Sequence, residues 1–370
     1  MIAGHASTSG TALYRDRFPA LREVQHFREP ASQNLWLSSI GLGTYLGEPD
    51  DAADREYTDA IVTALRSGIN VLDTAINYRH QRSERNIGTA LANLIAAGEL
   101  RRDQVFVSTK AGYLSFDGNL PADPRSYFIR EYVEPGILDP SQIAGGMHCM
   151  APSFLENQIE RSRRNLGLET IDLFYLHNPE TQLGEIARDA FYARLRQAFD
   201  LLEAQVGAGH LRYYGMATWN GLRVPDTSRD FIDLFRVEEM ARQAGGDEHH
   251  FRFLQAPFNL AMPEAYTVSN QQGQGERMSL LAAAGRLSMG VFGSATLLQG
   301  RLAAGLPRQI LQRIGARNDA QAAIQFARSA PGLATALVGM GHREHVPQNL
   351  DAVQSAPASF EQWSALVSAA

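Results

Sequence analysis

The chain has 370 residues, of which 44% are hydrophobic and 20% are charged, and its formal net charge is −6. A mildly acidic, evenly mixed charge gives no electrostatic reason to expect nucleic acid or an anionic membrane as a partner. The single cysteine, Cys149, excludes an intramolecular disulfide, and the N-terminus has neither the basic nor the apolar part of a secretory signal. No apolar run approaches the roughly 20 residues of a membrane span, so we expect a soluble cytoplasmic protein.

Residues 1–35 are polar and show no clear period. We read them as an N-terminal extension that lies on the surface or is partly disordered, followed by a single domain over residues 36–370. Short apolar runs then recur along the chain, and each is apolar on both faces, as in parallel strands that are buried on both sides. These runs cover residues 38–44, 69–74, 105–110, 171–177, 211–217, 252–258, 288–294 and 334–340.

Amphipathic stretches with helical spacing lie between these runs, over residues 55–68, 83–98, 153–167 and 187–209. Strands that alternate with helices in this number predict an α/β fold, a (β/α)8 TIM barrel. The rival is a doubly wound sheet, whose first loop carries G-x-G-x-x-G directly before a helix. Residues 41–47 read GLGTYLG and no helix follows at once, so we reject the rival.

A long segment, residues 111–152, separates the third predicted strand from the next helix and is rich in glycine, proline and aromatic residues. Loops of this length are usually functional or disordered. In a barrel this loop lies at the C-terminal end of the strands, where it can cover a site. Residues 271–275, QQGQG, predict a shorter flexible loop on the same face.

Four polar residues fall at the ends of predicted strands or just after them. Asp73, Lys110 and His177 end the second, third and fourth strands, and Tyr78 lies in the loop after the second. Because the functional groups of barrels collect at this end, we expect the four side chains to converge at the mouth.

These residue types form a chemical set. An ammonium group near a phenol lowers its pKa, and a buried lysine needs a carboxylate partner such as Asp73. A tyrosine and a neutral histidine can together polarise a carbonyl and deliver a proton as charge develops on its oxygen. The hydride has to come from a nicotinamide cofactor, because no side chain supplies one.

The sequence resembles the aldo-keto reductase superfamily in the segments LDTAINY, STKAGYL, IDLFYLHNPE and VGMGHREHVPQNL, which occur in the family's order from about residue 38 to 353. The resemblance implies a carbonyl (aldehyde or ketone) reductase that uses NADPH. It implies that Tyr78 is the general acid and that Lys110 tunes it. It further implies that Asp73 orients Lys110 and that His177 binds the carbonyl oxygen.

The cofactor positions match the family less evenly. After the fifth strand the family usually has Gly-x-Ser-Asn, and Ala217 and Thr218 stand at the Ser and Asn positions of that motif. Ser294 stands where an aromatic residue commonly stacks on nicotinamide. The basic residues that usually hold the 2′-phosphate are poorly kept, so NAD(H) remains open. His342 and Arg343 can compensate for them, so NADP(H) is the expected cofactor. The resemblance implies cofactor contacts from Thr218, Asn220, Gln255, Ser294, Gly341, Arg343, Gln348 and Asn349.

We expect Tyr45 and Trp219 to contact a small-molecule carbonyl substrate. His148 and Cys149 are interpreted as ordinary loop residues, because no spaced His or Cys ligand accompanies them, so no metal site is expected. Two alternatives stay open. The barrel is a non-catalytic or regulatory binder of nicotinamide cofactor, or it uses the cofactor to assist a lyase or isomerase reaction.

Overall fold

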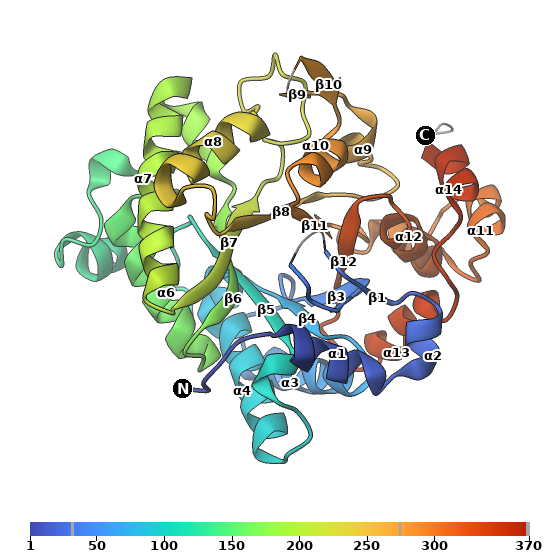
Figure 1. Cartoon of the computed structure of the whole chain (residues 1–370). Coiled ribbons are helices and arrows are strands. Elements are labelled where there is room, and N and C mark those ends of the chain that lie inside the picture. The colour runs from blue at the N-terminus through green and yellow to red at the C-terminus, as the bar shows by residue number, and fades with distance from the viewer. Residues whose placement is uncertain (31–32, 274, 368–370) are drawn as a thin grey trace.

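The computed structural model describes residues 1–30, 33–273 and 275–367, and a closed barrel of parallel strands lies at its centre (Figure 1). Each of the eight predicted runs overlaps one barrel strand, so the (β/α)8 prediction is confirmed. In barrel order, the strands are β11 (Gly290–Ser294), β12 (Leu333–Gly339), β3 (Ile40–Gly43), β4 (Val71–Asp73), β5 (Phe106–Ala111), β6 (Ile171–His177), β7 (Leu211–Ala217) and β8 (Phe251–Pro257).

Helices surround this barrel (Figure 1). The four stretches with helical spacing correspond to α3 (Asp51–Arg66), α4 (Arg82–Ala96), α6 (Pro152–Leu166) and α7 (Arg188–Gly207). Among the described residues, no helix has the length and apolar character that crossing a membrane requires. Apart from α5 (Pro124–Phe128) in the 111–152 loop, the other described α-helices after the first barrel strand are α8 (Leu234–Gly245), α9 (Glu264–Thr267), α10 (Leu280–Arg286), α11 (Arg308–Ile314), α12 (Asp319–Arg328), α13 (His345–Leu350) and α14 (Phe360–Val367).

The barrel separates two hydrophobic cores. The larger one lies between strands and helices, and the smaller one fills the lumen. Alternate residues of a strand point to opposite faces, so one set of alternating positions lines the lumen. Toward the starts of the strands this lining is apolar, with Val71, Phe106, Leu173, Phe253 and Phe292. The polar residues of the predicted site occupy the other end of the same strands.

The N-terminal residues close the apolar end of the barrel. They form α1 (Thr8–Asp16), α2 (Pro19–Glu23) and β1 (Phe27–Arg28), which pairs with β2 (Leu37–Ser38). Ala6 and Leu35 belong to the lumen core, and the buried Tyr14 hydroxyl donates to Leu65 O at 2.6 Å. Residues 1–30 and 33–35 therefore contain regular elements, and several of their apolar side chains are buried against the open barrel end while others, such as Leu13, stay exposed. The N-terminal extension over residues 1–35 itself stays a prediction. The boundary at residue 36 stays a prediction.

The two loops expected at the C-terminal face have structure of their own. The 111–152 loop contains α5 (Pro124–Phe128), a π-helical turn (Ile129–Val133) and a 3-10 turn (Pro140–Gln142). The 271–275 segment was expected to be a flexible loop. Instead, β9 (Gln271–Gly273) pairs with β10 (Glu276–Met278), and Gln271 Oε1 accepts a hydrogen bond from Leu234 N at 2.7 Å. Residue 274 lies outside the described residues.

Candidate active site

Asp73 and Lys110 form a buried ion pair at the C-terminal end of the barrel. Lys110 Nζ lies 2.6 Å from Asp73 Oδ2 and donates also to Thr74 O at 2.7 Å. Asp73 Oδ1 accepts from Ser108 Oγ at 2.7 Å and from Gln255 Nε2 at 2.9 Å. A buried ion pair is tolerated when further hydrogen bonds satisfy both groups, as they do here.

Tyr78 lies over this pair. It begins a short 3-10 turn (Tyr78–Gln81), and its ring centroid is 5.0 Å from Lys110 Nζ. The His177 ring lies 5.8 Å from the Tyr78 ring, centroid to centroid, at 76°. The structure thus brings the four residues of the predicted tetrad together at one mouth of the barrel.

The protonation states of the site follow from its burial. Burial raises the pKa of the Tyr78 phenol well above its usual value of 10, and the negative charge of Asp73 acts in the same direction. Burial lowers the pKa of His177 well below 6.5, and the Lys110 charge adds to this shift. Burial also lowers the pKa of Lys110, while Asp73 opposes that change. At neutral pH the phenol is protonated and the imidazole is uncharged.

This result corrects one expectation. From the sequence, Lys110 is expected to lower the pKa of Tyr78. In the structure the pKa of Tyr78 is raised instead. The physical reason is that the carboxylate of Asp73, in contact with the ammonium group, offsets its charge, and desolvation of the phenolate then dominates.

The turn after Tyr78 has an uncommon backbone. Arg79, His80 and Gln81 have φ values of 47°, 56° and 71°, in the left-handed region that favours glycine. Side-chain hydrogen bonds hold the turn: the Arg79 guanidinium donates to Asp54 Oδ1 and to Asn86 Oδ1, each at 2.7 Å. Residues kept in such conformations cost roughly 1–3 kcal/mol each and occur mainly at functional sites. The turn therefore fixes where the Tyr78 ring stands.

Three predicted cofactor residues lie at the ends of β7 and β8. Thr218 N donates to Gln255 O at 2.9 Å, and no described residue forms a hydrogen bond with its buried Oγ1. Asn220 Oδ1 accepts from Arg223 Nη2 at 3.0 Å. The side-chain nitrogen of Gln255 is bound to Asp73. Of these three side chains, the Thr218 hydroxyl has an unmet hydrogen-bonding need.

The other predicted cofactor residues lie on the strands and loops next to these. Ser294 ends β11, and its carbonyl accepts from Phe258 N at 3.0 Å. Gly341 lies between β12 and α13, where an added Cβ would come within 3.3 Å of the Tyr57 ring. The exposed Arg343 donates to Glu344 Oε1 at 3.0 Å. In α13, Gln348 is exposed and Asn349 is buried.

The two predicted substrate residues are exposed aromatic side chains. Tyr45 is 55% exposed, and its ring centroid lies 5.0 Å from that of Tyr78. Trp219 is 44% exposed, and its backbone N–H donates to Glu180 Oε1 at 2.7 Å. Tyr45 is therefore beside the tetrad, and Trp219 stands on the loop that follows β7.

Several residues of the site escape the sequence argument. Ser108 could have been found, since it precedes Lys110 by two positions on one strand and shares its face. Glu84 is fully buried between Thr109 Oγ1 at 2.6 Å and Asn165 Nδ2 at 2.8 Å, and burial raises its pKa. Glu180 accepts hydrogen bonds from the backbone N–H groups of residues 219–221. Neither carboxyl group could be given a role from the sequence, because the partners of each are far away in sequence.

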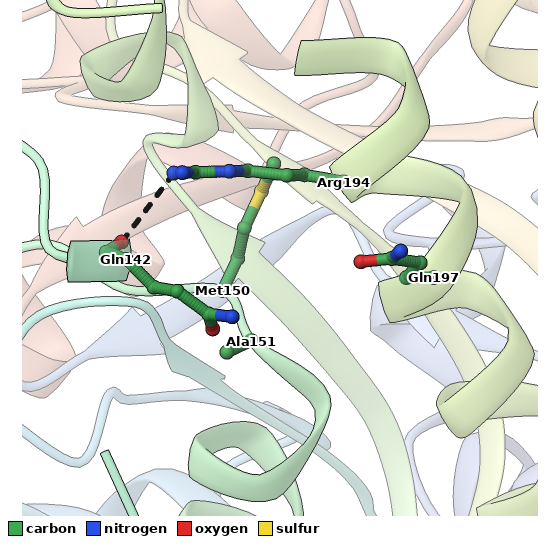
Figure 2. Close-up of a pocket in the computed structure, with 5 residues that line it drawn as sticks. All are labelled: Gln142, Met150, Ala151, Arg194 and Gln197. Atoms are coloured by element: carbon green, nitrogen blue, oxygen red, sulfur yellow. Dashed lines mark hydrogen bonds between the residues drawn. The ribbon is translucent and has the colours of Figure 1, made fainter. Parts of the chain in front are cut away.

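Two cavities lie away from the tetrad. A cavity of about 460 Å³ opens beside Leu211, the first residue of β7, and is therefore at the opposite end of the barrel. A cavity of about 40 Å³ lies between the 111–152 loop and α7 (Figure 2). Within residues 1–30, 33–273 and 275–367 there is no cluster of three or more His, Cys, Asp or Glu that could hold a metal ion.

Comparison with known proteins agrees with this geometry. The model of the aldo/keto reductase family matches residues 39–227. The chain is 30% identical over 143 residues to aldose reductase B of Dictyostelium discoideum, covering 39% of this chain and 33% of that protein. It is 29% identical over 153 residues to the NADH-specific methylglyoxal reductase of Escherichia coli, covering 39% of each. The chain spans between 24% and 55% of the length of the curated relatives it matches.

The fold is shared with solved structures. An aldo/keto reductase from Klebsiella pneumoniae, in complex with NADP and acetate, superposes with a TM-score of 0.60 at 20% identity. The superposition covers 92% of this chain and 93% of that one. The family model matches slightly more than half of the chain, so this protein belongs to the aldo/keto reductase family, as its motifs predict.

Proposed function

We propose that the protein is an NADP(H)-dependent carbonyl reductase in which Tyr78 donates a proton to the carbonyl oxygen of an aldehyde or ketone. The observation that carries the proposal is the convergence of Tyr78, His177 and the Lys110–Asp73 pair at one barrel mouth. Two neutral hydrogen-bond donors and a cation around one point form a site that stabilises developing negative charge on an oxygen.

Each side chain then has a defined part in the reaction. The raised pKa of Tyr78 keeps the phenol protonated, which a general acid requires. The lowered pKa of His177 keeps its imidazole neutral, so one ring N–H can donate to the carbonyl oxygen. Lys110 stabilises the phenolate that remains after proton transfer, and Asp73 keeps Lys110 in place.

The donor set fits a nicotinamide cofactor in part. The unsatisfied Thr218 hydroxyl lies where a carboxamide contact is implied, while Gln255 shares its amide with Asp73. When bound, the cofactor supplies the hydride. Binding would involve Thr218, Asn220, Gln255 and Ser294 near the tetrad, and Gly341, Arg343, Gln348 and Asn349 on the loop and helix after β12.

The choice between NADP(H) and NAD(H) depends on the loop after β12. Arg343 is exposed and offers positive charge, which favours a 2′-phosphate, although it pairs with Glu344; the exposed His342 beside it contacts Glu56. A related protein is named NADH-specific, and a structure with the same fold was solved with NADP. We therefore propose NADP(H), with NAD(H) as the alternative cofactor.

The test is Tyr78→Phe. We expect reduction of a panel of aldehydes and ketones, followed by the absorbance of the reduced nicotinamide, to fall at least about 100-fold, since a general acid typically contributes this much or more. Cofactor binding, followed by quenching of protein fluorescence, should stay within a few-fold. Tyr45→Phe is the matched control, because it removes a hydroxyl from the neighbouring ring but keeps the aromatic surface expected to contact the substrate; its loss of rate should stay far below that of Tyr78→Phe. A Tyr78→Phe variant with wild-type rates would refute the acid assignment.

Two observations favour a second function, a barrel that binds the cofactor without catalysis. Gln255 is tied to Asp73 and Ser294 provides no aromatic surface, which fits a barrel that binds the cofactor without turnover. Tight cofactor binding with no more than one turnover on every carbonyl tested would support this reading. Product analysis with the same substrates would reveal the remaining alternative, a cofactor-assisted elimination or isomerisation.

A further inference from the structure

His148, in the 111–152 loop, lies directly behind His177. Its side chain is buried, and its Nε2 lies 2.8 Å from His177 O, at the end of β6. Gly112, at the start of the same loop, permits this approach. A Cβ at that position would lie 2.6 Å from His177 O and 2.7 Å from His148 Nε2. The loop therefore packs so closely onto the backbone of His177 that a side chain at position 112 would not fit.

The hydrogen-bond partners determine which ring nitrogen of His148 carries the proton. Arg194 Nη1 lies 2.6 Å from Gln182 Oε1, and a guanidinium group can only donate, so the amide oxygen faces Arg194. The amide nitrogen then faces His148, where it donates to Nδ1 at 3.0 Å and to the backbone O at 3.1 Å. Because Nδ1 accepts, the proton is on Nε2, which donates to His177 O.

The neutral state of His148 follows from its surroundings. Burial lowers its pKa to about 4, and both ring nitrogens have partners that suit the neutral ring. No carboxylate lies within 4.0 Å of Arg194 in the part of the chain that the structure describes. The charge of Arg194 is directed at carbonyl oxygens instead, so it sets the amide orientation without protonating the ring.

The same loop also contacts the His177 ring. The Tyr113 ring meets the His177 ring edge-on, with centroids 5.2 Å apart and planes at 86°, and meets the His148 ring in the same way at 87°. Asn178, in the left-handed region at φ 47°, donates from Nδ2 to the Tyr113 hydroxyl at 3.1 Å. The His177 imidazole thus contacts the rings of both Tyr113 and Tyr78.

The outer end of this chain of hydrogen bonds reaches a cavity. Figure 2 shows the Arg194 side chain extending from α7 toward the loop, where Nη1 also donates to Gln142 O at 3.4 Å. The cavity of about 40 Å³ is lined by Gln142, Met150, Ala151, Arg194 and Gln197. Since one water needs on the order of 10–15 Å³ by this measure, the cavity is large enough to hold water at the outer end of the hydrogen-bond chain.

We propose that Arg194, Gln182 and His148 are positioning residues that fix the backbone and ring of His177, so that the 111–152 loop sets the orientation of the group that receives the carbonyl oxygen. The proposal rests on the proposed role of His177 in carbonyl binding. It also gives the long loop a function: the loop completes the site from behind, through its two ends at Tyr113 and His148.

The decisive variant is Gln182→Glu. An ionised carboxylate only accepts hydrogen bonds, and His177 O only accepts as well, so a ring placed between them has to carry protons on both nitrogens. NMR of the histidine ring nitrogens should show His148 changing from the neutral form with the proton on Nε2 to the imidazolium at neutral pH. The His177 ring signals should shift in the same spectrum. A purely structural role of Gln182 would move neither.

The kinetic readout uses the same variant. We expect kcat for carbonyl reduction to fall about 10-fold, with the KM for cofactor changing less than threefold. Gln197→Glu is the matched control, because this exposed residue lies on α7 with Arg194 and lines the cavity beside it without a hydrogen bond to His148; it should leave spectra and rates unchanged. His148→Gln keeps an N–H donor and should retain most activity, whereas His148→Phe should lose at least 10-fold.

The outcomes separate the two proposals. If Gln182→Glu leaves the histidine spectra and kcat unchanged, the positioning chain is refuted. If His148→Phe does not fold, the Gln182→Glu variant still tests whether the chain of hydrogen bonds positions His177. If the wild-type protein reduces no carbonyl, the proposed function fails, while the NMR spectra, which need no turnover, still report whether Gln182 and His148 control the His177 ring.

Discussion

The two ends of the barrel lumen are built from the same strands and stabilised in different ways. At the N-terminal end, Phe106, Phe253 and Phe292 form a cluster with ring centroids 5.4 to 6.0 Å apart, sealed by the N-terminal residues. At the C-terminal end, the same strand that carries Phe106 carries Lys110, bonded to Asp73. One end depends on packing of apolar surface, and the other on mutual satisfaction of buried polar groups.

Lys110→Met should have the largest effect, because it breaks the polar end. Removing one partner of a buried ion pair leaves Asp73 uncompensated and typically costs about 3–5 kcal/mol. Chemical denaturation should show this loss, and the proposed carbonyl reduction should fall by at least about 100-fold. The double variant Lys110→Met/Asp73→Leu should regain part of the stability and none of the activity. A single variant as stable as the wild type would show that the pair is not coupled to the fold.

Phe106→Ala tests the packed end. Truncating a buried phenylalanine costs about 3–5 kcal/mol through lost apolar contact and the cavity left behind. Because the cavity forms at the other end of the lumen, kcat and KM at a temperature where the variant is folded should stay within about threefold. A change in kcat or KM well beyond threefold in the folded variant would mean that the two ends of the lumen act as one unit.

The pH dependence of stability should reveal buried histidines at both ends. His148 lies at the polar end with its pKa lowered to about 4, and His26 at the closed end with its pKa lowered to about 3. Between those values and about 6.5 the unfolded chain binds more protons than the folded one. The free energy of unfolding should therefore rise with pH across this range, by up to about 1.4 kcal/mol per pH unit for each histidine.

The measurement is a series of denaturant titrations from pH 5 to pH 7. His148→Gln and His26→Gln should each make the pH dependence shallower, and by similar amounts. A variant with an unchanged slope would show that its histidine is not held neutral in the fold.

Ser108→Ala should give the smallest effect. It removes one of the hydrogen bonds that Asp73 Oδ1 accepts, and we expect a loss of about 1.5–3 kcal/mol, the usual value for a bond to a charged group. Thr335→Val is the matched control, because it removes a buried hydroxyl bond to the neutral Ser38 O and should cost about 1 kcal/mol. Equal losses in the two variants would contradict the special role of charge at the polar end.

The barrel and the tetrad were predictable from sequence for a simple reason. Runs that are apolar on both faces mark parallel strands, and the end of a strand is a position that the chain itself defines, so Asp73, Lys110 and His177 could be assigned to one rim. Ser108 follows from the same alternation. These predictions need only local pattern and one rule of topology.

The remaining features depend on contacts between distant segments. Ala6 and Leu35 seal the lumen, which an aperiodic polar segment does not reveal. The direction of the Tyr78 pKa shift depends on how completely Asp73 offsets Lys110 and how deeply the phenol is buried. His148 looked like an ordinary loop residue because its partners, His177 and Gln182, are brought to it only by the folded loop.

The left-handed turn after Tyr78 has a consequence for how this site can diverge. Arg79 connects the turn to Asp54 on α3 and Asn86 on α4, and Gln81 connects it to Phe116 in the long loop. Glycines at these positions would relax the backbone and release the phenol from its neighbours at the same time. The same three residues thus combine the cost of an unfavourable backbone with the contacts that anchor the phenol, so neither can be changed without the other.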